Sequence, residues 1–131
     1  MKEDFQIEYE FNVHPSKIYD AWLDSKSHQE MTGGGASIKP IIGSDFETWD
    51  AYIQGTIVEL HENHKIIQTW RTTEFDELDE DSELEIELKE KGDGCLLILR
   101  HSHIPKGQGE SYKKGWFEHY FEPMEFYFDG A

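Results

Sequence analysis

Cysteine and long apolar runs are scarce in this sequence, and each shortage excludes a class of protein. The chain has one cysteine, Cys95, so it forms no internal disulfide, which suits a reducing cytoplasm. No apolar run approaches the ~20 residues of a membrane span, and residues 1–4 lack the apolar core of a signal peptide. We therefore expect a cytoplasmic protein without a membrane partner.

Positive charge is also scarce. Twelve Lys and Arg residues stand against 28 Asp and Glu, which gives a formal net charge of −16. A surface this acidic repels phosphate backbones and anionic lipids. We therefore expect no nucleic-acid partner, and the partners left open are a basic or neutral ligand or a basic protein surface.

Aromatic residues are abundant by contrast. They make up 14% of the chain, including four Trp and eight Phe. The 131 residues suit one domain, residues 1–131, with one core. Large rings leave gaps in so small a core unless something fills them.

The first 35 residues predict a strand followed by two short helices. Apolar and polar residues alternate across residues 5–13, which predicts the strand. Pro15 stands where a helix can begin without losing a hydrogen bond. Asp24 can cap a second helix that runs through Met31 and ends at the three glycines of residues 33–35.

Five more strands are predicted from alternation or from short apolar runs. The acidic residues 76–81 predict a solvated loop, and Gly92 and Gly94 predict a hairpin turn. The last strand is apolar on both faces, so we expect it to have neighbours on both sides. The five strands cover residues 44–50, 53–60, 65–73, 83–89 and 95–103.

Residues 110–128 predict one long helix with a broad apolar face made of two adjacent stripes. Pro123 lies inside this helix and should kink it. The order of elements predicts an α+β helix-grip fold: a curved antiparallel sheet of six to seven strands around the long helix, with the short helices at one end of the groove. We expect Phe117, Phe121 and Met124 to face the deep core, and Trp116, Tyr120 and Tyr127 to face the groove.

Several stretches, in this order along the chain, are similar to one known family. The chain resembles the C-terminal domain of the activator of the heat shock protein 90 ATPase, in the START-like (Bet v-like, SRPBCC) superfamily. The likeness spans nearly the whole chain. The stretches are residues 18–22 (IYDAW), 31–38 (MTGGGASI), 55–60 (GTIVEL), 65–71 (KIIQTWR) and 115–121 (GWFEHYF).

The resemblance implies a START-like domain without a cofactor, and three functions of different classes. The superfamily's theme is an apolar cavity, which implies a non-enzymatic protein that binds a small apolar or amphipathic molecule between sheet and helix. The activator implies a chaperone as partner, whose ATPase the protein would stimulate. Superfamily members that act as cyclases imply an enzyme that uses the same cavity.

The residues themselves favour neither catalysis nor a metal. The sequence has no nucleophile elbow and no phosphate-binding loop, and Cys95 is predicted to be buried and inert. His101, His103 and His119 could bind zinc if they converged, but the family implies no metal. We therefore assign no catalytic or metal-binding residue, and we expect His101 to be a hydrogen-bonded histidine at the cavity wall.

Candidate ligand-binding residues come from several elements. Trp and Tyr suit a pocket because each joins a large apolar face to a hydrogen-bonding group. The rival interpretation is that these rings only fill one another's gaps, since interiors pack to crystal-like density. The candidates are Trp22, Trp70, His101, Trp116, Tyr120, Met124 and Tyr127.

Overall fold

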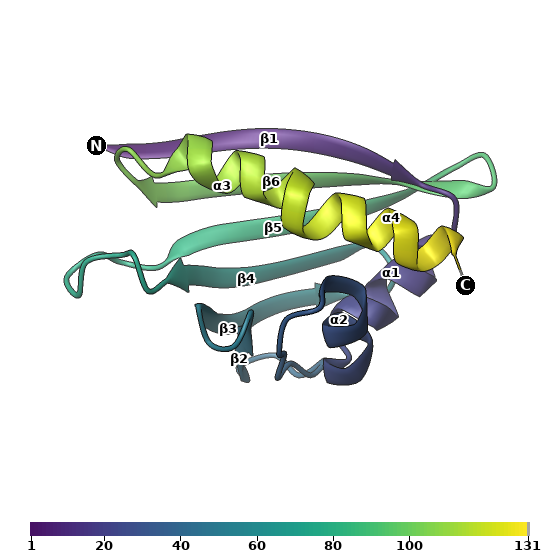
Figure 1. Cartoon of the computed structure of the whole chain (residues 1–131), viewed down its shortest axis with the longest axis horizontal. Coiled ribbons are helices and arrows are strands. Elements are labelled where there is room, and N and C mark those ends of the chain that lie inside the picture. The colour runs from purple at the N-terminus through teal and green to yellow at the C-terminus, as the bar shows by residue number, and fades with distance from the viewer. Residues whose placement is uncertain (131) are drawn as a thin grey trace.

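Six antiparallel strands form a curved sheet in the order β1-β6-β5-β4-β3-β2, and a long helix lies across one face (Figure 1). The computed structural model describes residues 1–130. The strands are β1 (Lys2–Phe11), β2 (Asp45–Thr48), β3 (Ile53–His61), β4 (Lys65–Thr72), β5 (Ser82–Lys91) and β6 (Gly94–Pro105). The helices are α1 (Pro15–Trp22), α2 (Ser25–Thr32), α3 (Gly109–Gly115), η1 (Trp116–Phe121) and α4 (Glu122–Asp129).

This arrangement confirms the predicted helix-grip fold. The segments α3, η1 and α4 form one continuous helix, and α1 and α2 lie near its C-terminal end (Figure 1). Both short helices begin as expected: Pro15 opens α1, and the Asp24 carboxylate accepts a hydrogen bond from the backbone N–H of Ser27 at 2.9 Å. Within residues 1–130, no helix is long and apolar enough to cross a membrane.

The strand β6 lies between β1 and β5, so it is a central strand with neighbours on both sides, as predicted. Leu97 and Leu99 are fully buried on the inner face, and Ile98 is buried on the outer face. The strand runs to Pro105, two residues beyond the predicted end. His103 has a positive φ of 65°, and this local irregularity in the strand brings Ile104 back into the core.

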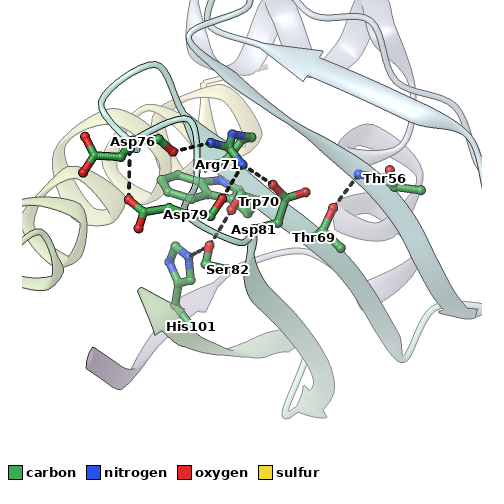
Figure 2. A network of polar contacts seen from close by, with 9 residues as sticks. All are labelled: Thr56, Thr69, Trp70, Arg71, Asp76, Asp79, Asp81, Ser82 and His101. Atoms are coloured by element: carbon green, nitrogen blue, oxygen red, sulfur yellow. Dashed lines mark hydrogen bonds and ion pairs between the residues drawn. The ribbon is translucent and has the colours of Figure 1, made fainter. Parts of the chain in front are cut away.

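The acidic residues 76–81 form a loop that is largely exposed to solvent, as predicted, and one arginine holds it to the sheet. Arg71 reaches into it, donating hydrogen bonds to the backbone carbonyls of Asp76 and Asp79 at 3.0 Å each and to the Asp81 carboxylate at 2.9 Å (Figure 2). One guanidinium satisfies three acceptors in this way, so the loop is fastened to β4.

The long helix is regular at both ends but π-helical in the middle. The backbone N–H of Glu122 bonds to the carbonyl of Phe117, five residues earlier. Pro123 explains the distortion, since a proline has no N–H and its ring crowds the carbonyl four residues before it. The irregularity expected at Pro123 therefore lies in the preceding turn, and the helix continues through Pro123 to Asp129.

The π-helical turn also corrects the prediction that Phe117 faces the deep core. A wider turn rotates the side chains before it relative to those after it. Phe121 and Met124 are fully buried, as expected, but Phe117 is half-buried at the side of the helix. Its ring lies 5.4 Å from Phe121 and 6.2 Å from Tyr9 on β1.

Candidate functional site

A groove of about 460 Å³ lies between the long helix and the sheet at β3 and β4. One wall comes from β3, β4 and the loop that joins β2 to β3. The other wall comes from α3 and η1. The lining residues are Trp49, Tyr52, Ile53 and Trp70 on the sheet side, and Ser111, Tyr112, Lys114, Gly115, Trp116, Glu118, His119 and Tyr120 on the helix side.

Five of the lining rings form an unbroken chain of neighbours. Between ring centres, Trp49 lies 6.4 Å from Tyr120, and Tyr120 lies 4.7 Å from Trp116. Trp116 lies 5.8 Å from Trp70, which lies 4.9 Å from Tyr112. These separations are those of favourable aromatic pairs. The groove therefore has a continuous aromatic wall contributed by both helix and sheet.

The place of Trp49 in this wall depends on an unusual turn. Trp49, Asp50 and Ala51 all have positive φ, at 52°, 56° and 71°, a conformation that costs roughly 1–2 kcal/mol for each residue other than glycine. The turn lies against the glycines after α2. A Cβ at Gly34 would come within 2.5 Å of the Trp49 ring, and Gly35 accepts a backbone hydrogen bond from Asp50 at 3.0 Å. The sequence predicted only that these glycines end a helix. The structure shows that they also leave room for the Trp49 ring.

His101 is held in one neutral form behind the aromatic wall. Its Nδ1 accepts a hydrogen bond from the indole N–H of Trp116 at 3.2 Å, because an indole N–H can only donate. The ring proton is therefore on Nε2, which donates to Ser82 Oγ at 2.8 Å, and Ser82 donates to the backbone carbonyl of Trp70 (Figure 2). Burial lowers the pKa of His101 to about 3.

A second buried histidine, His28, lies at the other end of the wall. Its Nδ1–H donates to the carbonyl of Trp22 at 2.8 Å, and its Nε2 lies 3.3 Å from the Tyr120 hydroxyl. That hydroxyl donates to Thr48 Oγ1 at 3.2 Å. Burial lowers the pKa of His28 to about 4 and raises the pKa of Tyr120 far above its usual value.

Only three of the seven candidate residues line the groove: Trp70, Trp116 and Tyr120. Trp22 stacks behind Trp116 with ring centres 6.2 Å apart, and its indole N–H donates to Gln68. His101 and Met124 also lie behind the wall, in the core.

Tyr127 is separated from the other candidates. It lies in α4, beyond the π-helical turn, and lines a different surface hollow together with Val13 and Phe128. The prediction that Tyr127 shares a stripe with Trp116 and Tyr120 assumed a regular helix. The π-helical turn breaks that register.

The groove also contains residues that the sequence did not single out, namely Trp49 as a wall residue, Tyr52, Tyr112, Lys114 and Glu118. Tyr112 could have been found, because Tyr112, Trp116 and Tyr120 follow one another at steps of four along the helix. The strand predicted over residues 44–50 ends at Thr48. Trp49 and Tyr52 therefore lie in the turn between β2 and β3, where no periodic pattern indicates the direction of a side chain.

The histidines considered as zinc ligands do not converge. His101 uses both ring nitrogens within the core, His103 faces Glu80 at 3.5 Å on the surface, and His119 packs its ring against Trp49. Among residues 1–130, no three His, Cys, Asp or Glu side chains are placed to hold a metal ion. Cys95 is buried, which raises the pKa of its thiol to about 11.

The curved sheet, the long helix and the aromatic groove between them define a helix-grip domain with a candidate ligand site. The chain belongs to the family described as Activator of Hsp90 ATPase homolog 1-like protein, which matches it over residues 12–129. This membership confirms the resemblance found in the sequence. A comparison with curated proteins gave no match.

Solved structures agree with this assignment. An HSP90 activator from Plasmodium falciparum is 26% identical in sequence, with a TM-score of 0.85 over 95% of this chain and 94% of that one. CalU16 from Micromonospora echinospora is 19% identical, with a TM-score of 0.83 over 98% of this chain and 76% of that one. The Aha1 dimer from Colwellia psychrerythraea is 12% identical, with a TM-score of 0.80 over 96% of each chain. The last two show a shared fold alone.

Proposed function

We propose that the protein is a non-enzymatic binding domain that holds a small apolar or amphipathic molecule in the groove between β3, β4 and the long helix. The observation that carries this proposal is the continuous aromatic wall around a volume of about 460 Å³. Small-molecule sites are typically concave, mostly apolar and about 300–1,000 Å³ in volume.

The state of the buried polar groups favours binding over catalysis. His101 has both ring nitrogens occupied and a pKa of about 3. A general acid or base works best when its pKa lies near the working pH, so His101 is unsuited to proton transfer at neutral pH. The same holds for the buried His28, whose pKa is about 4. The cyclase-like alternative would have to use other groups.

The test is a titration of intrinsic tryptophan fluorescence with a panel of aromatic and amphipathic molecules, alongside native mass spectrometry of the purified protein. Trp49, Trp70 and Trp116 line the groove, so an occupant should change their emission. Trp49→Leu should weaken binding. Phe126→Leu, a change to an exposed side chain on α4, should leave it unchanged. If no compound perturbs the spectrum and no molecule co-purifies, the binding proposal is wrong.

A second candidate function is binding to a heat shock protein 90 chaperone, with a cytoplasmic location. The similarity to the Plasmodium falciparum HSP90 activator favours it. So does Phe126, which is 80% exposed on α4 with Glu122 one turn before it and Asp129 one turn after it. An exposed aromatic ring flanked by carboxylates would fit a partner that has an apolar pocket surrounded by basic residues.

This candidate predicts a complex that salt weakens steeply, since exposed charges are screened over ~8 Å at physiological ionic strength. The test is a pull-down with the cognate chaperone at low and at physiological salt, together with its ATPase rate. Phe126→Ser should reduce capture, whereas the groove variant Trp49→Leu should not. Absence of a complex even at low salt would remove this candidate.

A further inference from the structure

We infer that the groove selects a cationic ligand, a molecule that carries a methylated ammonium group beside a flat apolar part. This inference rests on the proposed function, because it concerns the occupant of the same groove. It follows from three observations: the aromatic residues that line the groove, the hydrogen bonds already made by its tyrosine hydroxyls and by the indole of Trp116, and the charges around the groove.

Several polar atoms on the lining rings already have hydrogen-bond partners within the protein. The hydroxyl of Tyr112 bonds to Thr72 and Gln108, that of Tyr52 bonds to Glu74, and that of Tyr120 bonds to Thr48. The indole N–H of Trp116 bonds to His101. These rings therefore have few free hydrogen-bond donors for a ligand, and the π-system of an aromatic ring carries negative charge density that attracts cations.

The lining rings are close enough together to favour a cation jointly. Neighbouring rings along the wall lie 4.7 to 6.4 Å apart, centre to centre. An ammonium group interacts with a ring when it lies within about 6 Å of the ring centre. The groove lining includes rings from both the helix and the sheet, and three of them are indoles, which are the strongest aromatic partners for cations.

The charges near the groove support the same sign of ligand. The Glu118 carboxylate lines the groove, and Glu74 accepts the hydrogen bond of the lining Tyr52. The lining contains one lysine, Lys114, whose side chain is 75% exposed. Its Nζ lies 4.0 Å from Oε2 of Glu118, so the carboxylate partly neutralises the positive charge. The whole chain adds a net charge of −16, which concentrates cations and repels anions.

Three probes of similar shape separate charge from apolar contact. They are 2-phenoxyethyl-trimethylammonium, its uncharged carbon isostere 3,3-dimethylbutyl phenyl ether, and the anion 3-phenoxypropanoate. Dissociation constants are measured on the full chain by tryptophan fluorescence and by chemical-shift perturbation at low salt and pH 8. The cation should bind about tenfold more tightly than the isostere, and the anion should bind most weakly.

The possible results distinguish this inference from the proposed function. If the isostere binds as tightly as the cation, the groove is an apolar ligand site and the cationic inference is wrong. If none of the three probes binds, the inference and the proposed function both fail for this ligand class.

Two single-charge variants on one helix face provide a matched control. Glu118 and Lys114 are both exposed and one helical turn apart, so neither change should affect folding. Glu118→Gln should weaken binding of the ammonium probe by about two- to threefold, and Lys114→Gln should strengthen it by a similar factor. Both changes should affect binding of the ammonium probe more than binding of the carbon isostere, which carries no charge. Shifts in the same direction, or equal shifts for the isostere, would overturn the inference.

Discussion

Trp116 donates its indole N–H to Nδ1 of His101 across 3.2 Å, so a single hydrogen bond between two buried side chains joins the long helix to β6. The bond also links the groove wall to a hydrogen-bond network in the core. Trp116 is part of the groove wall, and His101 is the centre of a network that continues through Ser82 to the backbone of β4. The position of the wall is therefore set from inside the core.

Trp116 should be important for stability as well as for the groove. Trp116→Ala removes a large buried side chain at the contact between helix and sheet, and it should cost about 3–5 kcal/mol of unfolding free energy. Trp116→Phe keeps most of the ring but leaves Nδ1 of His101 without its donor, which should cost about 1–3 kcal/mol. Urea denaturation measures both. A loss below about 1 kcal/mol for the alanine variant would mean that Trp116 is not a core residue.

The two buried histidines should make stability fall as the pH is lowered. Burial lowers the pKa of His101 to about 3 and of His28 to about 4, whereas both have their ordinary pKa when the chain is unfolded. The unfolded chain therefore binds more protons below about pH 6.5, so each histidine's contribution is complete above that pH and is lost as the pH falls toward the folded pKa. Each should contribute a slope of up to about 1.4 kcal/mol per pH unit.

Urea denaturation between pH 5 and pH 7.5 measures this slope. The range avoids the pH at which carboxylates become protonated, because relief of the −16 charge would act in the opposite direction. His101→Gln should lower the absolute stability but flatten the slope. His64→Gln, a change at an exposed histidine, should leave the slope unchanged. An unaltered slope in His101→Gln would contradict the assignment of a neutral buried ring.

Arg71 should control the order of the acidic loop. Its three hydrogen bonds to Asp76, Asp79 and Asp81 fasten residues 76–81 to β4. Arg71→Gln should lose most of them and expose the loop to proteolysis near Leu78, whose side chain is already exposed. Limited proteolysis followed by mass spectrometry checks this.

A second arginine serves as the control for that experiment. Arg100 pairs with Glu85 and Glu87 on the outer face of the sheet, away from the loop. Arg100→Gln should leave cleavage near Leu78 at the wild-type rate. Equal protection of the loop in Arg71→Gln would show that the loop holds its shape without the arginine.

The sequence predicted the sheet and the helices well because their signals are periodic. Alternation of apolar residues or short apolar runs marked the strands, and the apolar spacing marked the long helix within one residue of its observed ends. The deep core positions Phe121 and Met124 followed from the same spacing. Local patterns of this kind need no knowledge of distant parts of the chain.

The site was harder to predict because three features of it are not periodic. The π-helical turn separates Tyr127 from Trp116 and Tyr120, although all three suit one stripe of a regular helix. The turn at Trp49 depends on glycines fifteen residues earlier in the sequence. His28 became a buried partner of Tyr120 only through tertiary packing. Each feature depends on contacts between segments, which residue patterns do not encode.

The glycines after α2 should be required for the groove, and a single methyl group tests this. In Gly34→Ala the added Cβ would meet the Trp49 ring at 2.5 Å and the Trp49 Cα at 3.1 Å, so the turn at Trp49 must shift. Because overpacking typically costs about 1–3 kcal/mol, the variant should be destabilised by that amount. It should also move Trp49 out of the groove wall, with weaker ligand binding and a changed tryptophan emission spectrum.

Gly115→Ala provides the matched control. Gly115 is helical, and the nearest atom to an added Cβ is His119 Cδ2 at 3.8 Å, which is ordinary contact. Because glycine in a helix is less stable than alanine by about 0.5–1 kcal/mol, this variant should be slightly more stable than the wild type. The two alanines should therefore have opposite effects on the urea midpoint. If Gly34→Ala is as stable as Gly115→Ala and keeps the wild-type emission, the glycines do not hold Trp49 in place, and the groove wall must be positioned by the helix alone.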